Sequence, residues 1–436
     1  MRISTRVRTI QRVLAFTLIV MCITASAWAG ETVLRSFPGG TNGQSPEGAL
    51  ARDSSGNLYG TTTNAGISNE TGGCGIVFEL SPATGGGYTP SVLYTFQAVS
   101  STDGCNPESG VILDSAGNLY GTTTLGGNAG SGTVYELVRG SGGTWTENIL
   151  WNFTGGDDGA YPSTGVVFDS ESNLYGTTSA GGVQSCTLNG SESGCGTVYK
   201  LAPTAGGEWT ETTLYEFPNE DSGIGPNSLA FDEHGNLFGT TAFGGPPPRL
   251  DCNSELGCGV VFELRLEAAG SFKYSVIYSF ASASATDGEN PTGVVILNGA
   301  HLYGATNGGG TAGDGTVWEL SHGASGWTEN ILYNFTGGND GANPGSPLLL
   351  GATGALYGAS GGGNTGCSNG CGTLFRLTNS KSGWSEKVLL RFDKTDGDDS
   401  GWFGNGLIQD SAGNLYGVTA TGGSSGDGVV FEFTMP

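Results

Sequence analysis

The sequence predicts an all-β protein, a seven-bladed β-propeller with four antiparallel strands in each blade. Three observations lead to this fold class. The string Asn-Leu-Tyr-Gly-Thr-Thr recurs in seven versions along the chain, short strand-like segments surround each version, and the first and last versions are incomplete in complementary ways. A period of some tens of residues is typical of a protein built from one structural unit repeated many times.

The recurring string first occupies residues 57–62. Its aromatic position, which is Tyr in six copies and Phe in one, falls at residues 59, 120, 175, 238, 303, 357 and 416. Successive copies are therefore 54 to 65 residues apart and fill the chain after residue 30.

Each copy contains four short apolar or alternating runs bounded by turn residues, as expected for strands. In the second copy these runs are strand a (110–114), strand b (118–123), strand c (132–137) and strand d (145–153). A tight Asp/Gly turn at 114–117 joins strands a and b, and its carboxylate can accept backbone N–H groups. Four antiparallel strands per repeat make a propeller blade.

The ends of the repeat array favour a closed ring. Residues 32–37 match strand d and precede the first strand a, whereas the last copy contains only strands a, b and c, at 406–410, 414–419 and 428–433. Pairing the N-terminal strand with the last blade would complete that blade and remove an exposed sheet edge. An open solenoid would instead have atypical capping copies. We therefore expect one propeller domain over residues 30–436.

The first 29 residues are expected to be a secretory signal peptide. Four arginines precede an apolar run from Val13 to Ile23, and Ala27-Trp28-Ala29 is a small-residue cleavage signal. A lipoprotein signal would need a small residue before Cys22, where Met21 stands. We expect cleavage near Ala29 and a secreted protein, extracellular or periplasmic. No second apolar run has membrane length, so no membrane span is expected.

Charge limits the choice of partners. Without the signal the chain carries 12 basic and 40 acidic residues, a net charge of −28. Nucleic acid and anionic membranes are not expected to bind such a surface. The charge suits cations, basic ligands or simple solubility. We expect a monomer that requires no cofactor.

Eight cysteines follow Cys22, an even number that favours disulfides in an exported protein. In a propeller the b–c loops and the d–a loops between blades emerge on one face, which makes a bridge between adjacent blades feasible. The expected pairs are Cys74–Cys105, Cys186–Cys195, Cys252–Cys258 and Cys367–Cys371. The alternative is a zinc site, but Cys367 and Cys371 have no second cysteine pair at ligand spacing nearby.

A second element of this loop face is the motif Asp/Asn-Gly-x-x-Pro. It begins at residues 42, 103, 158, 287 and 340, and a related acidic loop begins at residue 396. One interpretation is a structural Asx-type turn before the innermost strand. The other is a ring of carboxylates around the central channel that holds Ca²⁺ or a cationic ligand. The candidate binding residues are Asp103, Asp158, Asp287, Asp340 and Asp396.

No catalytic constellation emerges from the sequence. His234, His301 and His322 fall at the opposite end of the blades from the b–c loops and are not expected to share a pocket. The strand c carboxylates, such as Glu136, are replaced by Lys200 and Arg376 in two copies, so this position is expected to face solvent. The strand d tryptophans are better explained by blade packing than by sugar stacking.

The pattern Gly-Asn-Leu-Tyr-Gly-Thr-Thr, Gly-Gly and Gly-Thr-Val-Tyr-Glu-Leu at 117–137 resembles the GloVer tandem repeat of "choice-of-anchor" secreted bacterial proteins. The resemblance covers residues 31–433 and implies export and a repeat region, often followed by a surface-sorting tail that this sequence lacks. It implies no activity. The segment Asp-x-x-Gly-Asn-Leu-Tyr is also similar to propeller repeats of sensor ectodomains.

These observations predict a secreted, non-enzymatic propeller that binds an extracellular partner, a glycan or a cation through its b–c and d–a loop face. The alternative is an extracellular carbohydrate-active enzyme, a polysaccharide lyase or glycoside hydrolase, on the same scaffold.

Overall fold

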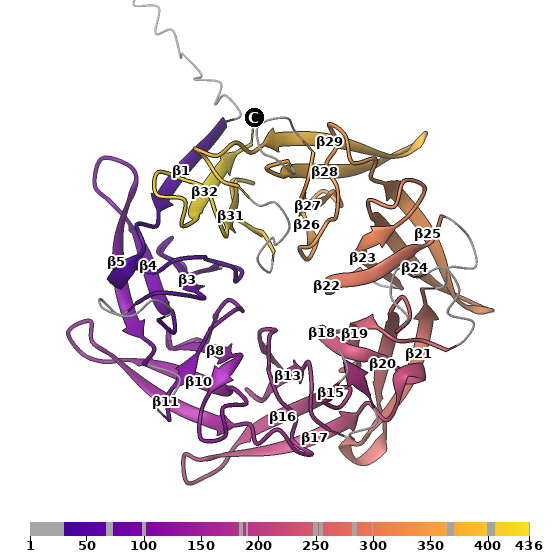
Figure 1. Cartoon of the computed structure of the whole chain (residues 1–436), viewed down its shortest axis with the longest axis horizontal. Coiled ribbons are helices and arrows are strands. Elements are labelled where there is room, and N and C mark those ends of the chain that lie inside the picture. The colour runs from indigo at the N-terminus through magenta and orange to yellow at the C-terminus, as the bar shows by residue number, and fades with distance from the viewer. Residues whose placement is uncertain are drawn as a thin grey trace, which may run out of the picture.

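The structure is a computed structural model that describes residues 30–66, 73–97, 102–182, 186–188, 191–246, 252, 256–280, 286–298, 300–363, 370–398 and 406–435. Within them, seven four-stranded antiparallel sheets stand as blades around a central axis (Figure 1). The predicted seven-bladed propeller is confirmed. In every blade strand a is innermost and strand d is outermost.

The first three blades follow one another along the chain. Blade 1 contains β2 (Ala51–Arg52), β3 (Leu58–Thr62), β4 (Ile76–Pro82) and β5 (Tyr88–Thr95). Blade 2 contains β7 (Ile112–Leu113), β8 (Leu119–Thr123), β10 (Thr133–Arg139) and β11 (Trp145–Asn152). Blade 3 contains β12 (Val167–Phe168), β13 (Leu174–Thr178), β16 (Thr197–Pro203) and β17 (Trp209–Glu216).

The remaining blades repeat this order. Blade 4 contains β18 (Ile224–Phe231), β19 (Leu237–Phe243), β20 (Val260–Leu266) and β21 (Phe272–Ser279). Blade 5 contains β22 (Gly288–Asn298), β23 (His301–Gly309), β24 (Thr316–Gly323) and β25 (Gly326–Asn334). Blade 6 contains β26 (Leu349–Leu350), β27 (Leu356–Ser360), β28 (Thr373–Ser380) and β29 (Gly383–Arg391). Blade 7 contains β30 (Ile408–Gln409), β31 (Leu415–Thr419), β32 (Val429–Thr434) and β1 (Gly30–Ser36).

The loops contain small additional elements. Two-stranded pairs join β6 (Gly104–Cys105) to β9 (Leu125–Gly126) and β14 (Thr187–Leu188) to β15 (Ser191–Glu192). Short 3-10 turns are η1 (Gly40–Asn42), η2 (Glu220–Ser222) and η3 (Ala268–Gly270). Among the described residues, no helix has the length and apolar character needed to cross a membrane. The expected signal peptide, residues 1–29, lies outside them.

Strand b forms the buried centre of each blade, which explains the constancy of its sequence. All five residues of β3 are buried. A Cβ at Gly60 would lie only 2.6 Å from Cζ of Phe78 on β4, so an aromatic ring of strand c occupies the space above this glycine. The Leu-Tyr-Gly-Thr-Thr string thus encodes a strand that is covered on both faces.

Strand a is shorter than predicted in blades 2 and 7, the two for which its bounds were predicted. The sequence predicts a strand over 110–114, but only Ile112 and Leu113 pair with β8. The preceding segment is held by side-chain hydroxyls instead, since the Thr61 hydroxyl of blade 1 donates to the carbonyl of Ser109 at 2.8 Å and Ser109 Oγ bonds Thr122 Oγ1 at 2.8 Å. The first of these bonds ties blade 1 to blade 2, and the second lies within blade 2.

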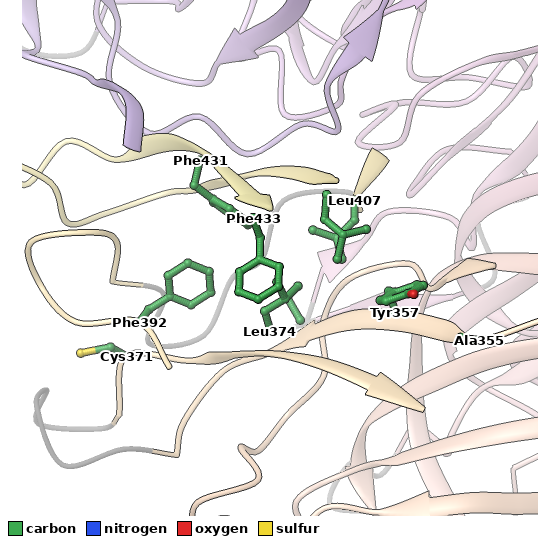
Figure 2. Packing of buried hydrophobic residues seen from close by; sticks show 10 residues of the cluster. Ala355, Tyr357, Cys371, Leu374, Phe392, Leu407, Phe431 and Phe433 are labelled. Carbon is green, nitrogen blue, oxygen red and sulfur yellow. The ribbon is translucent and has the colours of Figure 1, made fainter. Parts of the chain in front are cut away.

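Aromatic pairs fill every junction between blades. A Phe that follows strand d of one blade meets the strand c aromatic of the next, as for Phe392 and Phe431, whose ring centroids are 5.1 Å apart. Figure 2 shows this pair beside Leu374 and Phe433. The other six pairs are Phe37–Phe78, Phe96–Tyr135, Phe153–Tyr199, Phe217–Phe262, Phe280–Trp318 and Phe335–Phe375. Each such pair contributes about 0.5–1.5 kcal/mol beyond the burial of its area.

The ring is closed by its first strand. β1 pairs with β32 in antiparallel register from Gly30 opposite Thr434 to Ser36 opposite Val429. The predicted completion of the last blade by the N-terminal strand is confirmed (Figure 1).

Candidate functional site

The b–c and d–a loops meet on one face, as predicted. Cys74 directly precedes the glycine that opens strand c of blade 1, and Cys105 lies in the d–a loop that leads to blade 2. The two form a disulfide with a Cα–Cα distance of 4.4 Å, and both are buried. A covalent bond therefore joins two adjacent blades on this face.

Two further disulfides close single b–c loops. Cys186–Cys195 and Cys252–Cys258 join the expected pairs, with Cα–Cα distances of 5.2 and 5.4 Å. Cys371 is disulfide-bonded, but its expected partner Cys367 lies outside the described residues. Disulfides of this number indicate an oxidising compartment.

The candidate carboxylates belong to the d–a loops, and Asp103 illustrates their environment. It is 8 % exposed and accepts backbone N–H groups from Gln97 at 2.8 Å and from Gly104 at 2.7 Å. The Tyr94 hydroxyl on β5 donates to it at 3.1 Å. These contacts hold the loop against the outermost strand of its blade.

The other candidates have related partners. Asp158 accepts from Thr154 N and from the Trp151 indole, Asp287 from Gly288 N and the Tyr278 hydroxyl, Asp340 from Thr336 N and the Tyr333 hydroxyl, and Asp396 from Asp393 N. The backbone donors precede the aspartate or follow it directly, whereas an Asx-type turn uses the N–H two residues further on, so these bonds tie the loop to the end of strand d in another way. Four of these carboxylates have an aromatic partner on an outermost strand, so the structure does not gather these four around the central channel: Asp103, Asp158, Asp287 and Asp340. Their role in binding a ligand stays a prediction.

A glutamate of the following blade approaches these aspartates. Glu147 on β11 accepts the same Tyr94 hydroxyl at 2.8 Å that also donates to Asp103. Burial, with the charge of Asp103 second, raises the pKa of Glu147 to about 8. The sequence analysis did not identify this group. The sequence pattern that could have identified this glutamate is Trp-Thr/Ser-Glu at the start of strand d. It occurs at 145–147, 209–211, 327–329 and 384–386.

The residue before the loop proline connects neighbouring blades through its backbone. Asn106 has a φ of 60°, donates its N–H to the Cys74 carbonyl at 3.0 Å and accepts from Thr124 N at 3.0 Å. Asn tolerates this left-handed conformation better than most residues. At the equivalent position of the next loop stands Tyr161, with a φ of 58° and 40 % exposure.

At the opposite end of the blades, a polar network centred on an Asp of the a–b turn recurs in five blades. In the a–b turn, Asp114 accepts from Ala116 N and Asn118 N, and the Tyr120 hydroxyl donates to Glu136 on strand c at 2.7 Å. Glu136 is therefore half-buried and hydrogen-bonded. Glu136 also lines an open groove, so it reaches solvent as expected, while the preceding strand supplies a buried hydroxyl for it.

The histidines do not converge. His301 Nδ1 lies 2.8 Å from Glu319 and pairs in register with Ser321. His322 is the next residue of that strand, so its side chain points to the other face of the sheet, where it contacts Trp327. His234 lies in blade 4 and is largely exposed. Among the described residues, no group of three or more His, Cys, Asp or Glu side chains is arranged to hold a metal ion.

An open groove of about 760 Å³ lies on the outer wall between blades 2 and 3. It follows β11 from Glu147 to Asn152 and meets the start of β17 at Trp209, and Glu136 and Glu208 also line it. Trp209 packs edge-on against Tyr120 with ring centroids 6.4 Å apart, which supports the predicted role of these tryptophans in blade packing.

The chain is thus a closed, disulfide-bonded repeat propeller whose loops vary on one face. Residues 23–186 and 251–436 match the model of the Gloeobacter/Verrucomicrobia repeat. The chain belongs to this family, as its repeat strings predicted. No curated protein matches it.

Solved structures with similar folds have low sequence identity. The extracellular domain of a putative one-component system from B. thetaiotaomicron has a TM-score of 0.52 and 10 % identity; the match covers 93 % of this chain and 42 % of that one. This chain thus spans about two-fifths of that protein. Kuenenia stuttgartiensis hydrazine synthase has a TM-score of 0.50 and 13 % identity, over 89 % and 95 % of the two chains. At such identities the similarity shows the fold alone.

Proposed function

We propose that this protein is a non-enzymatic extracellular propeller that binds a partner, a glycan or a cation through its b–c and d–a loop face. The observation that carries the proposal is a contrast between the two ends of the blades. Five residues separate strand a from strand b in six of the seven blades, whereas 6 to 18 residues separate strand b from strand c. Uniform turns serve the scaffold, and variable loops on a rigid scaffold are typical of recognition.

Covalent bonds support this assignment. The described disulfides all lie in the loops of this face, where they order segments that have few strand contacts. Ordering a loop before a ligand arrives reduces the entropy lost on binding. The aromatic pairs at the junctions already hold the blades together, so we attribute the disulfides to the ordering of the loops.

Tyr161 is the residue of this face that we expect to contact a ligand. Its aromatic side chain is 40 % exposed although its backbone adopts a conformation that is costly for a bulky residue. The backbone is held by a bond from Tyr161 N to the Ser131 carbonyl at 2.9 Å and by one from Ser179 N to the Tyr161 carbonyl at 3.1 Å. An exposed aromatic ring on a backbone held in this way can stack on a sugar or insert into a protein surface.

The test uses a substitution that the repeat itself tolerates. Asn occupies the position of Tyr161 in three other loops, so Tyr161→Asn is expected to preserve the fold. We would screen the purified chain on a glycan array and by calorimetry with Ca²⁺, with Val92→Ala on the outer strand β5 as control. Tyr161→Asn should weaken a detected interaction about tenfold or more, with an unchanged melting temperature, while Val92→Ala should not. Equal binding by both variants would remove this face from consideration.

The second candidate is a carbohydrate-active enzyme, and the groove between blades 2 and 3 favours it. The groove combines Trp151 and Trp209 with Glu136 and Glu147, and glycosidase chemistry needs two carboxyls beside the scissile bond. Polysaccharide hydrolysis or lyase activity that is abolished by Glu136→Gln or Glu147→Gln, in a variant that melts like wild type, would establish the enzyme and overturn the binding proposal.

A further inference from the structure

Five of the seven blade junctions bring together an Asp of the d–a loop and a Glu of the next blade's strand d. The pairs are Asp103 with Glu147, Asp158 with Glu211, Asp287 with Glu329, Asp340 with Glu386, and Asp396 with Glu31. The register of the sheets shows that these glutamates are equivalent, because each lies opposite a buried Leu or Phe of strand c, as Glu147 lies opposite Leu137.

A tyrosine hydroxyl bridges the two carboxyls in two of the pairs. The Tyr278 hydroxyl donates to Asp287 at 3.2 Å and to Glu329 at 2.8 Å, as Tyr94 does for its own pair. In the pairs that contain Glu147, Glu329 and Glu31, a hydrogen bond with the paired Asp is among the causes that raise the pKa of the glutamate. Ionised carboxylates only accept hydrogen bonds, so such an interaction between two carboxyls needs a proton on one of them.

The two junctions without such a pair lack both acids. Between blades 3 and 4, Ser222 occupies the loop position and Tyr274 the strand position, and the Tyr274 hydroxyl donates to the Ser222 carbonyl. Between blades 7 and 1 the loop residue is Asn42 and the strand residue opposite Leu80 is Pro90. The Asp and the Glu are therefore present or absent together, as expected if they act as a unit.

One carboxyl oxygen of four of these glutamates has no hydrogen-bond donor beside it among the described residues. This oxygen is the buried Oε1 of Glu31, Glu147, Glu329 and Glu386. The titratable groups that act on Glu147 are Asp103 and Tyr94, with Tyr135 behind it on β10. Asp393 adds a further acid near Glu31, and Thr213 bonds Glu211. Arg391 is the basic group that acts on Glu386.

We propose that these paired carboxyls make the stability of the ring depend on pH: each pair shares one proton below neutral pH, and losing that proton in alkaline solution places two carboxylates together and loosens the junction. The inference concerns the scaffold and does not depend on the proposed ligand. The same Asp–Glu pairing would act at five junctions at once.

The pKa values of the glutamates agree with this geometry. Burial, followed by the charges or hydrogen bonds of the paired Asp, raises the pKa of Glu329 and Glu386 to about 7, that of Glu147 to about 8 and that of Glu31 to about 9. A raised folded-state pKa means that the stabilisation is complete below the ordinary pKa near 4.5 and is lost as the pH rises through about 7 to 9. Stability should therefore fall between these limits.

The experiment compares thermal unfolding at about pH 5 and about pH 9 for the wild type, for Glu329→Gln, and for a variant with all five glutamates changed to Gln. Gln retains the shape of a protonated Glu but cannot ionise. Glu233→Gln, in an exposed a–b turn, is the matched control. We expect the wild type to melt lower at the higher pH, Glu329→Gln to recover about 2–4 °C there, and the five-site variant to lose most of the pH dependence.

Two further measurements keep the proposal testable if the five-site variant fails to fold. The infrared band of protonated carboxyl groups should persist in the wild type near neutral pH and weaken in Glu329→Gln but not in Glu233→Gln. Millimolar Ca²⁺ at about pH 9 should change the melting temperatures of the wild type and of Glu329→Gln equally. A flat pH profile in the wild type, no difference between Glu329→Gln and Glu233→Gln, or a rise in melting temperature with Ca²⁺ that Glu329→Gln abolishes would each overturn the proposal, the last by identifying the pair as a cation site.

Discussion

Glu31 on β1 lies opposite Phe433 on β32, so two residues about 400 positions apart in the chain are neighbours in one sheet. β1 also delivers Phe37 to the junction with blade 1, where its ring meets Phe78 at 5.1 Å. The N-terminal strand therefore supplies both a sheet edge and a junction core.

Deleting residues 31–37 should destabilise the whole ring, because β32 loses its outer partner and the junction with blade 1 loses its aromatic ring. Adding the same segment after residue 433 through a short Gly/Ser linker should restore the melting temperature. A scrambled segment of equal length is the control. A deletion variant that melts like wild type would contradict the closure described above.

Removing one junction aromatic should be costly. Phe153 is fully buried and its ring lies 5.0 Å from that of Tyr199. Phe153→Ala should lower the free energy of unfolding by about 3–5 kcal/mol through lost burial and the cavity left behind. Val92→Ala, at a position 40 % exposed, should change it by less than about 0.5 kcal/mol. Denaturant unfolding of both variants tests the difference, and comparable losses would show that the junction core is not a main source of stability.

The disulfides should differ in their contributions. Cys74–Cys105 closes 31 residues, whereas Cys252–Cys258 closes 6. The loss of chain entropy in the unfolded state predicts about 4 kcal/mol for the first and about 2 kcal/mol for the second. Replacing each pair by alanines and measuring unfolding in denaturant gives this order directly. A larger effect from the shorter loop would mean that ordering of the b–c loop outweighs the entropy of the unfolded chain.

The a–b turns should set the acid limit of stability. Burial acts to raise the pKa of Asp169, but hydrogen bonds donated by Asn173, Glu171 N and the Tyr175 hydroxyl outweigh it and hold that pKa below its ordinary value. A lowered pKa contributes stability that is present above the ordinary value near 3.8 and is lost as the pH falls through the folded-state value. Asp169→Ala should cost about 1–3 kcal/mol at neutral pH and less in strong acid, measured against the exposed Asp157→Ala.

Much of the fold could be predicted because each blade is specified locally. The string at 57–62 identifies strand b, and the incomplete first and last copies identify the closing pair. Three disulfides also join the expected cysteines, since loop position in a repeat fixes which loops meet. The innermost strands were predicted too long, because the hydroxyls of Thr61 and Thr122 replace part of the backbone ladder there.

The partners of the loop carboxylates were not predicted. Asp103 and Glu147 belong to different copies, and only the packing of adjacent blades brings them together. Comparing copies one at a time hides such a relationship, because it appears only when the loop of one copy is compared with strand d of the next. The placement of Asp103 against β5 required the same knowledge of which strand is outermost.

The pairing of β1 with β32 also has a consequence for the order of folding. Each blade can form from hairpins between neighbouring segments, with short loops to close, whereas this pairing must bring together the two ends of a chain of about 400 residues. Contacts of such long range are slow to form. We therefore expect the seventh blade to be the last to assemble and a nearly complete ring, open at one junction, to be the most persistent intermediate in refolding.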